Sequence, residues 1–234
     1  MRSGRAQRGF TLVELMVALF AMALLAVLSW RGLDGMTRAQ AQTEARSDEV
    51  LTLQVGLAQW AADLDSLIEL PGITALNWNG RVLRMTRRSS TSVADGVVVV
   101  AWTRRIENGN GVWLRWQSQQ VTTRGDLDQA WQQADIWSQN PGDELRKREV
   151  SIVPLQAWEI FFYRADAWTN PQSSDAATAQ ASPAQPPASN PFGIPLQGSV
   201  PEGVRLVLQL PAGQSISGQI VRDWVRPTLG SNKS

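Results

Sequence analysis

The sequence has no cysteine and no histidine among its 234 residues. These absences exclude disulfide bonds, thiol nucleophiles, thiolate or imidazole metal sites and every mechanism that relies on a histidine base. Lysine is also rare, since only Lys147 and Lys233 occur, and the chain has no glycine-rich phosphate loop, GxSxG motif or SxxK motif. We therefore expect no enzyme, no cofactor and no bound metal.

An excess of charge of either sign is missing too. The 22 Lys and Arg residues nearly balance the 21 Asp and Glu residues, which leaves a formal net charge of +1. Nucleic-acid binding depends on a surplus of positive charge, so we expect no nucleic-acid partner.

The N-terminal part of the chain contains a long apolar run. Residues 10–30 (FTLVELMVALFAMALLAVLSW) are apolar apart from Thr11, Glu14 and Ser29. At about 1.5 Å per residue they span about 30 Å, the thickness of the hydrocarbon core of a bilayer. Three arginines in residues 1–9 precede the run, which predicts a single-pass protein with a cytoplasmic N-terminus and the remaining chain outside. No small-residue cleavage site follows, so a conventional signal peptide is not predicted.

Glu14 is the one charged residue within this run. A carboxylate inside a membrane helix costs about 2.5–3.5 kcal/mol, so it needs a partner unless it reaches the headgroups from near the helix end. The string around it, RGFTLVE at residues 8–14, resembles the class III signal of type IV pilins and pseudopilins. The resemblance implies that a prepilin peptidase cuts between Gly9 and Phe10 and methylates the new amine of Phe10. It also implies that Glu14 pairs with the amine of a neighbouring subunit, which compensates both charges only after assembly.

Residues 31–70 are predicted to continue the helix beyond the membrane. Proline is absent before Pro71, and Pro71-Gly72 is expected to end the helix. Apolar residues recur there at spacings of three and four, which places them on one helical face for packing against a sheet or in an interface. The stripe consists of Val50, Leu53, Leu57, Trp60, Leu64 and Leu67, and we assign the packing or interface role to Leu53, Leu57, Trp60 and Leu64.

Residues 71–234 show the alternation and turn signals of β-strands. Residues 96–102 (GVVVVAW) are apolar on both faces, which predicts a central strand, and the turn NGNG at residues 108–111 predicts a hairpin. Further strand candidates are residues 81–86, 112–117, 149–153, 159–163, 204–210 and 215–225. The predicted fold is α+β and pilin-like: a long N-terminal helix, transmembrane in its first half, packs on an antiparallel β-sheet head.

Two segments of the head stand out by composition. Residues 171–191 hold five prolines, one charge and no apolar residue larger than alanine, which predicts a disordered insert between two strands. Residues 125–128 (GDLD) carry two acids that could contribute to a calcium site. Calcium takes about six to eight oxygen ligands, so we expect a solvated turn there instead.

Tryptophan is unusually frequent, with 11 residues. Alternation along the strand at residues 112–117 places Trp116 with Val112 and Leu114, whereas Trp113 shares the other face with Arg115. Tryptophan and arginine are enriched at interface hot spots, so Trp113 and Arg115 are predicted to form an exposed partner surface.

Three further strings resemble the J-type minor pseudopilin of type II secretion systems: WRGLDGM at residues 30–36, GLAQWAADLD at residues 56–65 and VPEGVRL at residues 200–206. The resemblance implies an inner-membrane protein with a periplasmic head. It also implies a tip complex with the I-type and K-type minor pseudopilins, with the H-type as a further candidate, on a filament of the major pseudopilin. Such a complex primes assembly and helps to export folded proteins across the outer membrane. The implied parts are a leader (1–9), a transmembrane half-helix (10–30), a periplasmic half-helix (31–70) and a head (71–234).

Two other functions fit the sequence. A minor pilin of a type IV pilus or competence system has the same N-terminal signal and anchor. A surface-displayed glycan-binding module would instead use exposed tryptophans of the head to stack on sugars.

Overall fold

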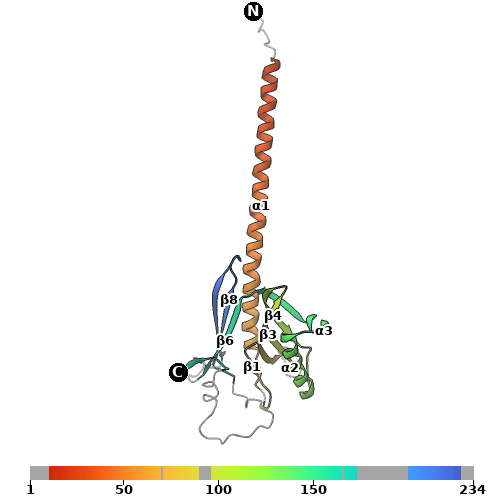
Figure 1. Ribbon diagram of the computed structural model, residues 1–234, viewed down its shortest axis with the longest axis vertical. Helices are drawn as coiled ribbons and strands as arrows, with labels where there is room; N and C mark the ends of the chain where they lie inside the picture. Colours follow the sequence, from red (N-terminus) through yellow and green to blue (C-terminus); the bar gives the residue numbers. More distant parts are fainter. Residues whose placement is uncertain (1–10, 70, 90–95, 165, 173–199, 228–234) are drawn as a thin grey trace, which may run out of the picture. The chain divides into compact units, whose positions relative to one another are not determined.

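The computed structural model describes residues 11–69, 71–89, 96–164, 166–172 and 200–227 (Figure 1). The chain divides into two units, residues 1–48 and residues 49–234. Helix α1 extends from Leu12 to Asp65, and strands dominate the second unit. The other elements are β1 (Leu76–Trp78), β2 (Val82–Arg88), β3 (Val97–Glu107), β4 (Asn110–Gln117), α2 (Arg124–Gln139), α3 (Asp143–Arg146), β5 (Glu149–Pro154), β6 (Ala157–Arg164), β7 (Ala167–Thr169), β8 (Gly203–Leu210) and β9 (Gly218–Val225).

The strands of the second unit form two sheets. One sheet has five strands in the order β1-β2-β3-β4-β5, and the other has four in the order β7-β6-β8-β9. All neighbouring strands are antiparallel. The predicted α+β class and antiparallel pairing are therefore confirmed, although the head contains two sheets where the sequence predicted one.

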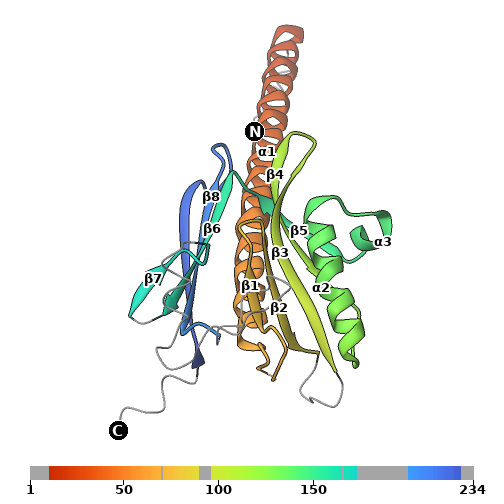
Figure 2. The ribbon, with the colours of Figure 1, turned by 60° about the horizontal axis from the view of Figure 1, so that its bottom comes forward.

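Residues 49–65 of α1 lie between these two sheets (Figure 2). Leu53, Trp60 and Leu64 are buried, and Leu57 is partly buried against the same core. The inner faces of both sheets supply the rest of this core. The apolar stripe of the helix therefore packs against both sheets of the same chain.

The β3–β4 hairpin forms as its sequence predicts. Glu107 pairs with Asn110, and the two residues between them, Asn108 and Gly109, have φ angles of 49° and 82°. Positive φ at both central residues is the geometry of the tight turns that suit the twist of a hairpin. Strand β3 is third of the five strands and buries side chains on both faces, which confirms the predicted central strand.

The helix ends earlier than predicted, at Asp65 and not at Pro71. The chain that follows pairs with β2: the N–H of Ile68 donates to the carbonyl of Thr86 at 3.2 Å, and the N–H of Arg88 donates to the carbonyl of Ser66 at 3.0 Å. Sheet hydrogen bonds therefore replace the last helical turn before proline is reached.

Helix α2 was not predicted, and residues 125–128 belong to its first turn, so the expectation of a solvated turn there is wrong. Its signals are nevertheless present. The N–H of Asp126 donates to the hydroxyl of the N-cap residue Thr123, and buried apolar residues recur at helical spacing. These buried residues are Leu127, Ala130, Ala134 and Trp137. They pack on the face of the five-stranded sheet that carries Val99 and Trp116.

The predicted Pro-rich insert lies almost entirely outside the described residues, which stop at Gln172 and resume at Val200.

Gly56 lies where α1 packs tightly against the five-stranded sheet. A Cβ atom at this position would lie 2.3 Å from Cγ2 of Ile152 and 3.3 Å from a ring carbon of Trp113. We predict that Gly56→Ala lowers the free energy of unfolding by about 1–3 kcal/mol through overpacking. Denaturant unfolding of the full chain in detergent, followed by tryptophan fluorescence, measures this change.

Gly125→Ala is the matched control, because no atom lies within 4 Å of a Cβ placed there. Alanine is also the better helix former, so this variant should be as stable as the parent chain or more stable. Equal stability of the two variants would contradict the close approach at Gly56.

Candidate functional site

The N-terminus of α1 carries a reciprocal contact between Thr11 and Glu14. The backbone nitrogen and the hydroxyl of Thr11 each donate to Oε2 of Glu14 at 3.4 Å, and the N–H of Glu14 donates to the hydroxyl of Thr11 at 3.3 Å. This arrangement is a capping box, which satisfies two N–H groups at the start of a helix. Glu14 is exposed in the single chain, so its carboxylate is accessible to a partner. Gly9 and Phe10 lie outside the described residues.

The residues after Glu14 form a candidate membrane span. By length and composition α1 is apolar enough to cross a membrane, and none of the side chains in its most apolar window is buried. Phe20, Leu25 and Trp30 are among the large apolar side chains exposed along it. Hydrocarbon would remove this surface from water, so the segment suits a membrane anchor.

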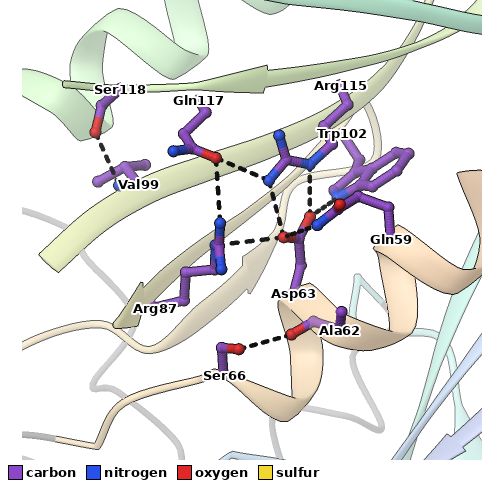
Figure 3. A network of polar contacts seen from close by, with 10 residues as sticks. All are labelled: Gln59, Ala62, Asp63, Ser66, Arg87, Val99, Trp102, Arg115, Gln117 and Ser118. Atoms are coloured by element: carbon purple, nitrogen blue, oxygen red, sulfur yellow. Dashed lines mark hydrogen bonds and ion pairs between the residues drawn. The ribbon is translucent and has the colours of Figure 1, made fainter. Parts of the chain in front are cut away.

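Asp63 is the centre of a buried polar network in the head (Figure 3). Its side chain is fully buried. Arg115 donates to it through two nitrogens at 2.8 and 2.9 Å, and the indole N–H of Trp102 donates at 3.0 Å. Gln59, one helical turn earlier, donates at 2.9 Å. Each partner is a donor, so both oxygens of the side chain act as acceptors.

A second arginine completes the network from β2. Nε of Arg87 lies 3.3 Å from Oδ1 of Asp63, and Gln117 accepts hydrogen bonds from both Arg87 and Arg115. Burial lowers the pKa of Arg87 from its ordinary value, whereas Asp63 raises it and Arg115 lowers it. A guanidinium still stays protonated in proteins, so the cluster holds two cations around one anion.

Two more acids fix the helix to the other sheet. Glu49 accepts hydrogen bonds from the backbone nitrogen and hydroxyl of Ser215, in the β8–β9 loop, at 2.9 and 2.6 Å. Asp65 accepts the indole N–H of Trp224 in β9 at 2.7 Å. Asp63 and Asp65 therefore accept hydrogen bonds from different sheets. This agrees with their positions, which are about 200° apart around a helix.

Trp113 and Arg115 do not form the exposed surface that the sequence predicted. Trp113 is fully buried and packs against Trp102, with ring centroids 4.6 Å apart and ring planes tilted by 34°, and Arg115 pairs with Asp63. The prediction was wrong because it assumed that one face of β4 meets water. Residues 49–65 of α1 cover one face of this sheet and α2 covers the other, so both faces are buried.

Most tryptophans of the head are structural. Several indole N–H groups bind polar side chains of neighbouring elements: Trp102 to Asp63, Trp224 to Asp65, Trp137 to Glu149 and Trp131 to Thr86. Among the described head residues, no tryptophan belongs to the exposed large apolar side chains. The exposed row of rings that glycan binding would use is therefore missing from this part of the chain.

A metal site would need several acidic side chains close together in the described ranges. Within them, no group of three or more Asp or Glu residues could hold a metal ion. Asp126, one of the two acids at residues 125–128, accepts a hydrogen bond from the hydroxyl of Thr123 at 2.7 Å.

Comparison with known families identifies the N-terminal motif. Residues 4–30 match the family model described as the prokaryotic N-terminal methylation motif. The match includes Gly9, Phe10 and Glu14, and it confirms the prepilin-type signal predicted from the sequence. No curated protein matches the chain.

One similar solved chain comes from the crystal structure of the GspK-GspI-GspJ complex of the enterotoxigenic Escherichia coli type 2 secretion system. The similarity covers 76% of this chain and 96% of that chain, with 14% sequence identity and a TM-score of 0.41. A TM-score this low does not establish a common fold. The fold is therefore assigned from helix α1 and the two antiparallel sheets of this chain.

The Asp63 network predicts a large effect of a small substitution. Asp63→Asn keeps the size of the side chain but turns an NH₂ group toward donors and removes the charge that compensates Arg115. We expect the free energy of unfolding to fall by about 3–5 kcal/mol, measured by denaturant unfolding of the full chain in detergent.

Asp223→Asn provides the control, because Asp223 pairs with Arg205 at 2.7 Å in a more exposed position. Its loss should cost less than about 1 kcal/mol. A similar loss in both variants would show that Asp63 does not hold the helix in the head.

Proposed function

We propose that this protein is a minor pseudopilin of a type II secretion system, most similar to the J type, and that it acts without catalysis. In this function it belongs to the pseudopilus tip complex, which primes assembly and helps to export folded proteins across the outer membrane. The observation that carries the proposal is the methylation motif at residues 4–30, followed by an apolar helix and a head. The J-type assignment depends on the strings at residues 30–36, 56–65 and 200–206.

Processing would create the charge that assembly needs. The prepilin peptidase cuts after Gly9, and the new amine of Phe10 is methylated and stays positively charged. This ammonium and the carboxylate of Glu14 both lie within the apolar run, where an unpaired charge is costly. Pairing of Phe10 in one subunit with Glu14 in the next compensates both charges, so assembly is favoured within the membrane.

The charge distribution supports one topology. The three arginines of residues 1–9 favour a cytoplasmic N-terminus, and a periplasmic head follows from that topology. The partners in this topology are the prepilin peptidase, the I-type and K-type minor pseudopilins, the H-type as a further candidate, and the major pseudopilin.

The second candidate is a minor pilin of a type IV pilus or competence system, because the same methylation motif serves both. A clean deletion in the native host separates the two functions when exoenzyme release and pilus-dependent motility are scored together. We expect exoenzymes to be retained in the periplasm while motility is unchanged. Lost motility with normal release would assign the chain to a pilus.

Glu14→Val tests the pairing step. Removing the carboxylate leaves the Phe10 ammonium of the neighbour without compensation, so we expect at least about a tenfold loss of co-purification with the other pseudopilins. The head should stay folded, as judged by unchanged protease resistance. Glu44→Val, which alters an exposed glutamate of α1 beyond the apolar run, should co-purify normally. Normal co-assembly and secretion with Glu14→Val would contradict the mechanism.

A further inference from the structure

The apolar run of α1 ends at an unusual pair of residues. Trp30 is 76% exposed, the highest value among the large apolar side chains that the structure describes. Arg31 follows it and is exposed. The nearest acid along the helix, Asp34, pairs with Arg38 at 2.9 Å, and Arg31 has no ion-pair partner within the described residues.

We propose that Trp30 and Arg31 form an interfacial anchor that binds the lipid headgroup layer on the periplasmic side of the membrane. The inference depends on the proposed function in taking residues 10–30 as the membrane span. An indole combines a flat apolar body with one N–H donor, which is why tryptophan concentrates at the boundary between hydrocarbon and headgroups. A guanidinium binds a phosphate through two hydrogen bonds, so Arg31 is suited to a lipid phosphate next to the ring.

The anchor determines how deep Glu14 lies. Glu14 and Trp30 are about 24 Å apart along the helix axis, whereas the hydrocarbon core is about 30 Å thick. With Trp30 held at the periplasmic boundary, Glu14 stays about 6 Å inside the cytoplasmic one. Without the anchor, the helix is free to slide toward the cytoplasm until the carboxylate reaches headgroups. The anchor thus keeps Glu14 where another subunit's amine is its best partner.

The position of Trp30 around the helix favours lipid over a neighbouring subunit. At about 100° per residue, Trp30 lies about 160° from Glu14 around α1. A helix that turns Glu14 toward a neighbouring subunit therefore turns Trp30 away from it. The indole then faces the lipid.

The absence of cysteine makes this depth measurable with a single thiol. Gly32→Cys adds one just beyond the anchor, where no atom lies within 4 Å of the new Cβ. The full, uncleaved chain is reconstituted in vesicles of phosphatidylethanolamine and phosphatidylglycerol and labelled with a membrane-impermeant maleimide. A separate variant, Gln132→Cys, carries its thiol at an exposed position of α2. Its labelling gives the fraction of molecules whose head lies outside the vesicle.

We expect Trp30→Leu to slow labelling at position 32 by about threefold, because the thiol moves into the interface. Trp30→Tyr keeps an amphipathic ring and should label at the parent rate. Phe20→Leu is the matched control for loss of an aromatic ring within the run and should also have no effect. Adding Glu14→Val to Trp30→Leu should restore the parent rate, because no buried carboxylate then pulls the helix.

An unchanged labelling rate in Trp30→Leu would overturn the inference. So would a change that appears in host cells but not in the vesicles, which would assign Trp30 to a protein contact. The vesicles contain no other secretion protein, so this result is independent of whether deletion of the gene impairs secretion. Failure of the anchor and failure of the proposed function are therefore distinguishable.

Discussion

The ion pair between Asp63 and Arg115 is the interaction on which the head depends. It joins the helix to the five-stranded sheet in a place that water does not reach, and Trp102 and Arg87 complete the coordination of the same carboxylate. A buried carboxylate without these donors would be strongly destabilising, so the network admits one position of residues 49–65 against the sheet. The apolar stripe of the helix provides most of the buried apolar surface. Asp63 determines where the helix sits along the five-stranded sheet.

Some of the tryptophans contribute to the same kind of contact. The carboxylate of Asp63 accepts from Trp102 as well as from Arg115 and Gln59, so an indole is one of several kinds of donor to this buried acid. The indole N–H groups of Trp102, Trp224 and Trp137 donate to Asp63, Asp65 and Glu149. The buried indole nitrogens of Trp60, Trp113 and Trp116 have no hydrogen-bond partner among the described residues, so these three rings only fill space in the core. Because an indole N–H stays uncharged, it satisfies an acid without adding a second buried charge. These tryptophans therefore belong to the core of the head, whereas the sequence had predicted an exposed partner surface at Trp113.

Local chemistry was predictable from the sequence, and contacts between distant segments were not. Residues adjacent in the sequence define both the signal around Glu14 and the central strand at residues 96–102. A short stretch of sequence is therefore enough to predict each of them. Trp113 was misplaced because strand alternation separates two faces but does not say that both are covered. The partners of Asp63, Trp102 and Arg115, lie 39 and 52 residues further along the chain. No local pattern brings these side chains together.

The proposed function requires a mature chain that begins at a charged, methylated Phe10. Mass spectrometry of the N-terminal peptide from the protein purified out of its native membrane measures where the chain begins and whether it is methylated. We expect a peptide that starts with N-methyl-phenylalanine followed by Thr11, with residues 1–9 absent. A chain that keeps residues 1–9, or one cut at another position, would contradict it.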